Sequence, residues 1–391
     1  MRVLAGKRVL DFTTTIAGPY CARLLADLGA AVIKVEAPDG DMIRTRPPLR
    51  DGASAAYGQL NAGKRSIALD LKRPEAVAIV RRLVAQADIL VENFRPGVMR
   101  RLGLHYDALK EIKPDLIYCA ISGYGQTGPS AELPAYAPAI HAAAGYDLAH
   151  LAYQPGRERP DNCGIYIADY FTGTFAFGAV MTALLHRQAT GEGQMVDVSM
   201  METMLNLTGG EVLATQFTVA PPGRPMFGPL ATKDGYIMPA VAAERTFVGI
   251  CRAAGREDWI TDPRFAIYAD RRNNWGLFVD ELEVWSRTLT TAECQAAFDK
   301  HGVPNSPYRT IREALADPQL AHRQALTDVH DAGGTFRVVN APFRLSATQT
   351  TVNNFAAALG EHTQEILTEL GYTQSDVAAL SATGAVGLGS K

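Results

Sequence analysis

The chain has 391 residues, a formal net charge of −3, and a composition that is 47% hydrophobic and 20% charged. At about 150 residues per domain this length exceeds one small domain, and the composition is that of a globular protein rather than a disordered or fibrous one. No run of lysine and arginine provides the clustered charge that a nucleic-acid backbone requires, so we expect no nucleic-acid partner.

The cysteines and the N-terminus indicate the compartment. Five cysteines, with no two close in sequence, argue against a disulfide framework or a zinc ribbon and for a reducing environment. The first residues, MRVLAGKRVLDF, lack the apolar core and cleavage site of a signal peptide. The uncharged run 170–185 is shorter than the ~20 residues of a membrane span, which predicts a buried helix. We therefore expect a cytoplasmic protein with no membrane partner.

The first third of the chain alternates between strand-like and helical patterns. Apolar runs rich in β-branched residues predict strands at 7–14, 31–36, 66–71, 88–94 and 115–122. Helical spacing predicts helices at 19–28 and 74–87. This alternation is typical of a mostly parallel sheet with helices on both faces, and ligands of such sheets bind at the carboxyl ends of the strands.

The rest of the chain is less regular. A long helix follows the Pro-, Ala- and Gly-rich segment 127–165, and four prolines within 218–230 predict a crossing between domains. We predict a large α/β domain at 1–215, a smaller α+β domain at 226–325, and a C-terminal segment at 335–391 that returns to the large domain. The last eight residues, GAVGLGSK, are expected to fray.

Several common motifs are absent. The turn after the first predicted strand, TIAGP, has one glycine instead of the G-x-G-x-x-G of a dinucleotide site, so Glu36 at the end of the second strand gives weak support to such a site. The residues before Ser122 do not form the nucleophile elbow of a serine hydrolase. The eight histidines show no metal-binding spacing, and we expect no metal.

Asp169 is the strongest candidate for catalysis on residue chemistry alone. It is the only charged residue between Asp161 and His186. It could cap the N-terminus of a buried helix, or it could be a carboxylate nucleophile kept ionised by the helix dipole and by backbone N–H groups. The two roles are compatible.

Longer strings of sequence carry a resemblance to a known family. They include VLDFTTTIAGPYCARLLADLGAAVIKVE, GDMIRTR, NAGKRSIALDLK, ILVENFRPGVMRRLGL, ISGYGQTGP, IADYFTG, TGEGQMVDVSM and GVPNSP. On these strings the chain resembles the family III coenzyme A transferases of the CaiB/BaiF type, which include formyl-CoA, carnitine and succinyl-CoA-dependent CoA-transferases. The resemblance implies a Rossmann-like large domain, an interlocked homodimer, an acyl-CoA and a carboxylic acid as substrates, and no permanently bound cofactor.

The resemblance also implies roles for residues. Asp169 matches the nucleophile of the family's D-x-x-x-G string, which attacks an acyl-CoA to form an aspartyl anhydride and then an aspartyl-CoA thioester. The positions that match CoA-contacting residues of the family are Ile16, Leu71, Lys72, Asn93, Phe94, Arg101 and Tyr136. Arg44 and Arg46 could each bind a phosphate or an acceptor carboxylate, or be solvated surface residues.

The chain departs from two branches of the family. Formyl-CoA transferases have Gln at the position of Ile16, Glu at that of Ala137, and a polyglycine loop where this chain has the short segment 223–230, which argues against formyl-CoA and oxalate as substrates. The α-methylacyl-CoA racemases use the His of an AGHD string, where this chain has Tyr146. A tyrosine is poorly suited to a two-base proton exchange near neutral pH. The racemase and a non-catalytic CoA-binding protein remain as alternatives.

Overall fold

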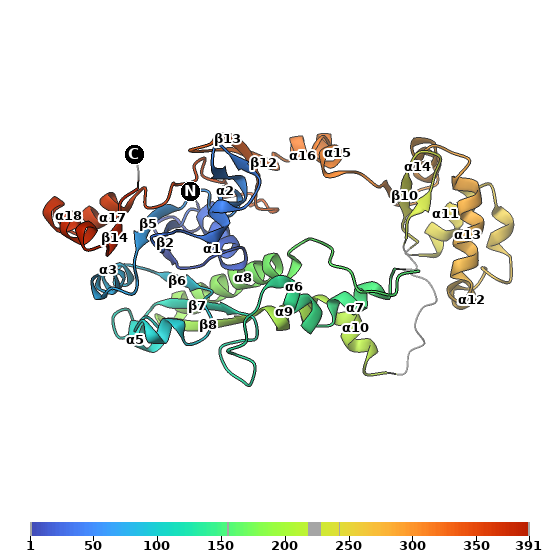
Figure 1. Cartoon of the computed structure of the whole chain (residues 1–391). Helices are drawn as coiled ribbons and strands as arrows, with labels where there is room; N and C mark the ends of the chain where they lie inside the picture. Colours follow the sequence, from blue (N-terminus) through green and yellow to red (C-terminus); the bar gives the residue numbers. More distant parts are fainter. Residues whose placement is uncertain (1, 155, 218–227, 242, 390–391) are drawn as a thin grey trace. The chain divides into compact units, whose positions relative to one another are not determined.

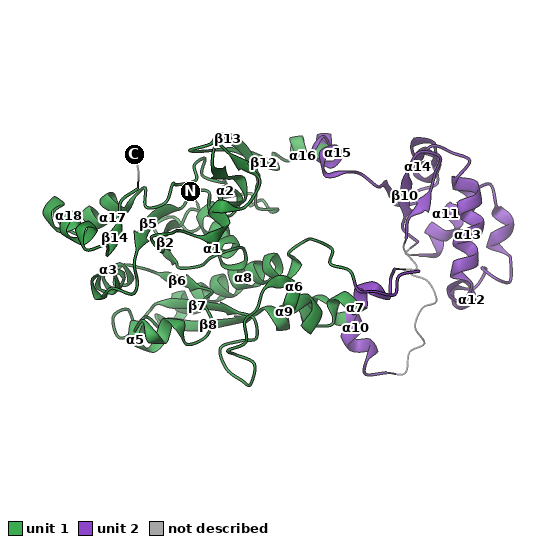
Figure 2. Cartoon of the chain, viewed as in Figure 1, with its two compact units in different colours: residues 1–148, 161–209, 319–391 green, residues 149–160, 210–318 purple. Residues whose placement is uncertain are grey.

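The chain forms two compact units in a computed structural model that describes residues 2–154, 156–217, 228–241 and 243–389. Unit 1 comprises residues 1–148, 161–209 and 319–391, and unit 2 comprises 149–160 and 210–318 (Figure 2). The N-terminal and C-terminal parts of the chain thus belong to the same unit. The boundaries predicted from the sequence stay predictions, and most of the proline-rich crossing, with the start of the predicted small domain, lies outside the described residues.

A mostly parallel sheet is the centre of unit 1. Within the described residues it has seven strands in the order β14-β5-β2-β1-β6-β7-β8 (Figure 1). These are β1 (Arg8–Asp11), β2 (Ala31–Glu36), β5 (Arg65–Leu69), β6 (Ile89–Glu92), β7 (Ile117–Ser122), β8 (Gln194–Ser199) and β14 (Val386–Gly387). Every pairing is parallel except that of β14 with β5. The predicted α/β class with a mostly parallel sheet is confirmed.

Helices cover both faces of this sheet. On one face lie α1 (Ala17–Asp27) and α8 (Ile167–Thr190), and on the other α3 (Pro74–Val84) and α17 (Thr363–Glu369). The neighbouring β1 residues Val9 and Leu10 belong to the two opposite cores. The neighbouring strands β6 and β7 are buried along their whole length and are nearly continuous apolar runs, whereas the edge strand β8 alternates between more and less exposed residues.

Shorter elements complete unit 1. They are η1 (Met42–Thr45), β3 (Leu49–Arg50), β4 (Ala53–Ser54), α2 (Ala55–Asn61), α4 (Val98–Arg101), α5 (Tyr106–Lys110), α6 (Ala137–Ala143), α9 (Met200–Leu207), β12 (Leu326–Asp331), β13 (Gly334–Val339) and α18 (Gln374–Ala382). Three helices lie at the boundaries between the units: α7 (Tyr146–Leu151), α10 (Gly209–Ala214) and α16 (Pro318–His322).

The C-terminus corrects one expectation, because the last eight residues are not all frayed. Val386 and Gly387 form β14 and pair with Leu69 and Ala68 of β5. An edge strand exposes unpaired N–H and C=O groups, and β14 satisfies those of β5. The sequence pattern missed this strand because two residues are too few to show a period.

Unit 2 has its own small core. Its sheet has the order β11-β10-β9, and Trp259 is packed edge-on against Phe278 with ring centroids 5.3 Å apart. The elements are β9 (Leu230–Ala231), β10 (Tyr236–Pro239), α11 (Glu244–Ala253), η2 (Glu257–Ile260), α12 (Tyr268–Asn273), α13 (Trp275–Ser286), α14 (Thr291–Lys300), β11 (Asn305–Pro307) and α15 (Ile311–Leu315).

Helix α8 has two different faces. Among the described residues it is the one helix long and apolar enough to cross a membrane, by length and composition alone. Val180 and Ala183 are buried against the sheet, whereas Phe171, Phe175 and Leu185 on the opposite face are exposed. The prediction of a buried helix therefore holds for one face only.

Candidate active site

The turns that follow the parallel strands meet at one edge of the sheet. Thr13–Thr15 follow β1, Asn93 and Phe94 follow β6, and Ser122 ends β7. This is the edge at which α/β sheets bind ligands. Residues at the ends of three strands predicted from the sequence therefore lie at the carboxyl edge of the sheet, where we expected a ligand site.

Asp169 lies in the first turn of α8, near this edge. The N-cap position is Tyr166, so Asp169 is the third helical residue rather than the cap. The positive end of the helix dipole favours a carboxylate there. Burial acts in the opposite direction and raises the pKa of Asp169 to about 7. The side chain therefore exchanges between its neutral and ionised forms near neutral pH.

Gly173 explains the spacing of the D-x-x-x-G string. It lies one helical turn after Asp169, and a Cβ atom there would come within 2.5 Å of the carbonyl oxygen of Ala17 in α1. The absence of a side chain lets the first turn of α1 pack directly on α8. As a result, Ala17 and Asp169 line the same pocket.

Two pockets adjoin Asp169. The first, which we call pocket A, has a volume of about 250 Å³ and is lined by Thr14, Ala17, Asn93, Phe94, Arg95 and Ser122 among others. The second, pocket B, has a volume of about 570 Å³ and is lined by Ile16, Ile43, Arg46, Pro47, Leu60 and Tyr166 among others. Both pockets share Thr15, Met42, Tyr136 and Asp169. Asp169 can therefore contact a ligand in either pocket.

The structure brings five of the predicted site residues together and leaves three apart. Asn93, Phe94 and Tyr136 line pocket A with Asp169, and Ile16 lines pocket B. The other three line neither pocket: Leu71 and Lys72 follow β5, and Arg101 is an exposed residue at the end of α4. The roles of all eight residues stay predictions.

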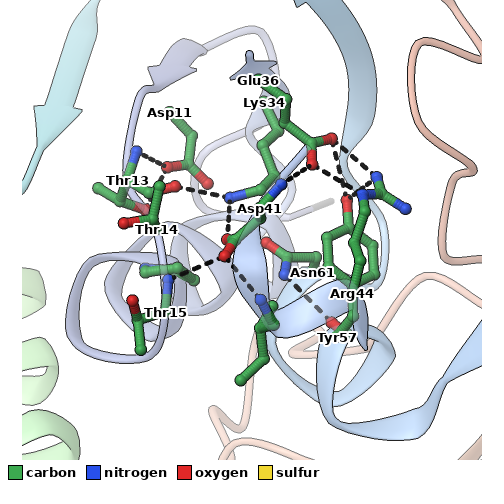
Figure 3. A network of polar contacts seen from close by, with 12 residues as sticks. Asp11, Thr13, Thr14, Thr15, Lys34, Glu36, Asp41, Arg44, Tyr57 and Asn61 are labelled. Carbon is green, nitrogen blue, oxygen red and sulfur yellow. Dashed lines mark hydrogen bonds and ion pairs between the residues drawn. The ribbon is translucent and has the colours of Figure 1, made fainter. Parts of the chain in front are cut away.

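Side chains from three separate segments hold the turn Thr13–Thr15, and Figure 3 shows two of them, Lys34 and Asp41, beside it. Lys34 Nζ donates to the first carbonyl oxygen of the turn at 2.7 Å. Asn93 exchanges two hydrogen bonds, of 2.8 and 2.9 Å, with the backbone of the second residue. Asp41 Oδ1 accepts from the third N–H group at 3.2 Å. The third residue, Thr15, has φ of 71°, a strained value for a β-branched residue that these contacts stabilise.

Two buried ion pairs lie beside this turn. Lys64 Nζ lies 2.7 Å from Asp11 Oδ2, and Lys34 Nζ lies 3.2 Å from Asp41 Oδ2. Burial alone would raise the pKa of Asp11, but the ammonium groups of Lys64 and Lys34 lower it below its usual value. Burial lowers the pKa of Lys64 to about 8. The pairs keep these buried groups charged, which fixes the geometry of the turn.

Two buried residues next to the site were not identified from the sequence. His141, in α6, accepts a hydrogen bond at Nε2 from the N–H of Ala168, which precedes Asp169, at 3.0 Å. Glu92, at the end of β6, accepts at Oε2 from the N–H of Phe94 at 2.9 Å, and burial raises its pKa to about 8. Neither residue belongs to a local motif, so only the tertiary contacts reveal them.

Metal ligands and disulfides do not contribute to this site in the described part of the chain. No group of three or more His, Cys, Asp or Glu side chains there is placed to hold a metal ion. The five cysteines are free, and four of them are buried.

Comparisons with known proteins identify the family. The model of "CoA-transferase family III" matches residues 4–363. The chain is 35% identical to a "Succinyl-CoA--D-citramalate CoA-transferase" from Chloroflexus aurantiacus, over 97% of each chain. It is 33% identical to a "Succinate--glutarate CoA-transferase" from Agrobacterium fabrum, over 94% of this chain and 95% of the relative.

Solved structures agree. A CaiB/BaiF family protein from Brucella suis superposes with a TM-score of 0.81 at 33% identity, covering 94% of this chain and 99% of that one. A protein from Mycobacterium tuberculosis superposes with a TM-score of 0.84 at 29% identity, again covering 94% and 99%. The chain therefore belongs to CoA-transferase family III and is an enzyme that transfers coenzyme A.

Proposed function

We propose that the enzyme moves CoA from an acyl-CoA to a carboxylic acid through covalent intermediates on Asp169. The carboxylate of Asp169 attacks the thioester carbonyl, an aspartyl–acyl anhydride forms, and the CoA thiolate leaves. The thiolate attacks the aspartyl carbonyl of the anhydride, which gives an aspartyl-CoA thioester and releases the donor acid. The acceptor carboxylate then displaces CoA to form a second anhydride, and the thiolate attacks its acyl carbonyl to give the new acyl-CoA and free Asp169.

The single observation that supports this most strongly is the position of Asp169 between two pockets. A group that reacts in turn with a thioester and with a free acid needs contact with both partners at once, since the thiolate must stay close while the acids exchange. Asp169 lines both pocket A and pocket B. Its raised pKa also suits a nucleophile, because a more basic carboxylate attacks a thioester more readily.

In this proposal pocket A takes the thiol end of CoA and pocket B takes the acyl group or the acid. Asn93 and Phe94 in pocket A match CoA-contacting positions of the family, and the N–H groups at the start of α1 lie at the same wall. The lining of pocket B is largely apolar. The contacts of Leu71, Lys72 and Arg101 with the rest of CoA are part of the same proposal.

The enzyme is further proposed to work as a homodimer of interlocked chains in the cytoplasm. The support in this chain is the row formed by Phe171, Phe175 and Leu185 on α8, three large apolar side chains that are exposed on the face of the helix opposite the one packed against the sheet. Exposed apolar patches of this kind mark interaction surfaces. Analytical ultracentrifugation tests the dimer, and a monomer at micromolar concentration would contradict it.

The test of the mechanism is to trap the intermediate on Asp169. Incubation with succinyl-CoA and hydroxylamine should convert Asp169 to its hydroxamate, which peptide mass spectrometry locates. Asp169→Ala should show no trapping and no CoA transfer, whereas Asp39→Asn, which changes an exposed aspartate outside both pockets, should behave as the wild type. Transfer that survives Asp169→Ala would refute the mechanism.

The alternatives give different results in simple assays. A racemase would exchange an α-proton of its acyl-CoA with deuterated solvent and would need no added acid. Burial raises the pKa of Tyr146, which leaves even less of the side chain in the ionised form that could accept a proton near neutral pH, so this alternative is not favoured. A non-catalytic CoA-binding protein would bind CoA equally well with and without the Asp169→Ala substitution and would form no new thioester.

A further inference from the structure

Arg44 and Arg46 lie two residues apart and have different surroundings. The guanidinium of Arg44 makes hydrogen bonds of 2.7 and 2.8 Å with the carboxylate of Glu36 and one of 2.5 Å with the hydroxyl of Tyr57 (Figure 3). These contacts hold η1 beside β2 and α2, so the guanidinium of Arg44 is not free to bind a substrate. The side chain of Arg46 is exposed, lines pocket B, and makes no hydrogen bond or ion pair with a described residue.

The backbone of Arg46 is held in place although its side chain is not. Its N–H donates to the carbonyl oxygen of Ile43 at 3.1 Å, and its carbonyl oxygen accepts from Ser54 Oγ at 2.7 Å. Ser54 is in turn the N-cap of α2. The guanidinium therefore extends from a fixed point on the wall of pocket B, which reduces the entropy lost when it binds a ligand.

The rest of pocket B offers no second cation among its described lining residues. Asp169 and Arg46 are the only acidic and basic residues among them, and most of the others are apolar. The amide of Gln59 is occupied by two hydrogen bonds with the backbone of Val339. No ion pair or hydrogen bond joins Arg46 to Asp169 among the described residues, so the guanidinium is not taken up by that carboxyl.

We propose that Arg46 sets the acid specificity of pocket B by pairing with the distal carboxylate of an acid whose other carboxylate reacts at Asp169. This inference rests on the proposed function and names a residue that determines its specificity. A distal carboxylate that enters an apolar pocket needs a cation, because burying an unpaired charge is costly. A guanidinium binds a carboxylate through two parallel hydrogen bonds, and an uncharged group of the same shape lacks the charge that strengthens them.

The test compares glutarate with its monoamide, glutaramate, as acceptors of CoA from succinyl-CoA. The two acids differ only in whether the distal group is charged. In a mechanism with an enzyme-bound CoA intermediate, kcat/KM for the acceptor reports the second half-reaction alone, so a slower reaction with the donor does not affect it. The wild type should prefer glutarate by about 10- to 100-fold, the range expected for a charge-assisted pair.

Substitutions assign this preference to one side chain. Arg46→Gln should reduce the ratio of kcat/KM for glutarate over glutaramate to about 3 or less, and Arg46→Lys should retain part of it. Arg95→Gln removes the matching exposed arginine of pocket A, so it should raise KM for succinyl-CoA and leave the ratio unchanged. Arg312→Gln, an exposed residue of unit 2, controls for loss of charge in general.

Three results would overturn the inference. The first is a wild-type enzyme that uses glutarate and glutaramate equally well, or uses neither. The second is an Arg46→Gln variant that retains the full preference for glutarate. The third is an Arg46→Gln variant in which KM for succinyl-CoA rises while the ratio of kcat/KM for the two acids stays constant. The last would assign Arg46 to CoA. Trapping of Asp169 with hydroxylamine requires only the acyl-CoA, so a failure of the proposed mechanism is seen separately from a failure of the dicarboxylate assignment.

Discussion

Pockets A and B share Asp169 but differ in how they are built. Pocket A is formed by the turns after strands, where Asn93 is bonded to the backbone of Thr14 and Glu92 to that of Phe94. Pocket B is formed by η1 and by residues of α2, α6 and α8, with Arg46 as its one unpaired cation in the described chain. The backbone contacts of pocket A suit CoA, which takes part in every turnover. The side chains that line pocket B can differ between enzymes that use different acids.

The largest decrease in CoA-transfer rate is expected for Asp169→Asn, because the substitution removes the nucleophile of both half-reactions. Loss of the nucleophile should reduce CoA transfer by about 10³-fold or more. The same variant should be more stable at pH 8, by about 2–4 kcal/mol, because burial raises the pKa of the wild-type carboxyl to about 7 and ionisation then costs folding free energy. Chemical denaturation at pH 5 and pH 8 measures this difference.

The sign of that stability effect follows from proton binding. Between about pH 4 and pH 7 the folded wild type holds a proton on Asp169 that the unfolded chain has released, so its stability falls as the pH rises through this window. The variant has no such group, and its advantage should grow from pH 5 to pH 8. An advantage that is equal at both pH values would contradict the raised pKa.

Activity should depend on pH in the opposite sense. The ionised form of Asp169 is the nucleophile, so the single-turnover rate of its acylation should rise about tenfold per pH unit below pH 7 and level off above it. Rapid-quench measurement of the acylated enzyme from pH 5 to pH 9 tests this. Because pocket A and pocket B share this group, the same midpoint is expected whichever acyl-CoA is supplied, and a midpoint near pH 4 would be inconsistent with a buried carboxyl.

Gly173→Ala should damage both pockets through the fold. The new Cβ atom would lie 2.5 Å from the carbonyl oxygen of Ala17, so α1 and α8 must separate. We expect a loss of about 1–3 kcal/mol in the free energy of unfolding and a decrease of about 10-fold or more in transfer rate. Gly178→Ala is the matched control in the same helix, since its Cβ would meet no atom within 4 Å and should stabilise the helix by about 0.5–1 kcal/mol. Equal behaviour of the two variants would contradict the close packing.

The sequence predicted the sheet better than it predicted the site. The strands β1, β2, β5, β6 and β7 of the central sheet are mostly apolar and largely buried, and this pattern is local, so the sequence predicts each of them. The two-residue strands β3 and β4 are too short to show such a pattern. Asp169 is indicated by its place as the one charge in a long uncharged run, whereas Asn93, Phe94 and Tyr136 are indicated only because they match short strings of a family. The charge pairs under Thr15 were missed, because Asp11, Lys34 and Asp41 come from separate segments and only the fold brings them together.

The choice between Arg44 and Arg46 shows the same limit. Both belong to the string GDMIRTR, and nothing in that local pattern distinguishes their roles. The contact that does so is the salt bridge of Arg44 with Glu36, at the end of β2, which forms only when η1 packs beside that strand. The local sequence pattern identifies arginine as a residue type that can bind a carboxylate, whereas tertiary packing determines which of the two arginines has a guanidinium free to do so.

Glu92→Gln should have the smallest effect and should be confined to pocket A. Burial raises the pKa of Glu92 to about 8, so the side chain is largely neutral at pH 7 and an amide oxygen can accept the Phe94 N–H in its place. We expect KM for the acyl-CoA to change by less than about twofold at pH 7, with no change in kcat/KM for the acceptor acid. Glu92→Ala removes the acceptor and should raise that KM several-fold. A large effect of the glutamine variant on the acceptor would show that the two pockets are coupled through β6 rather than separate.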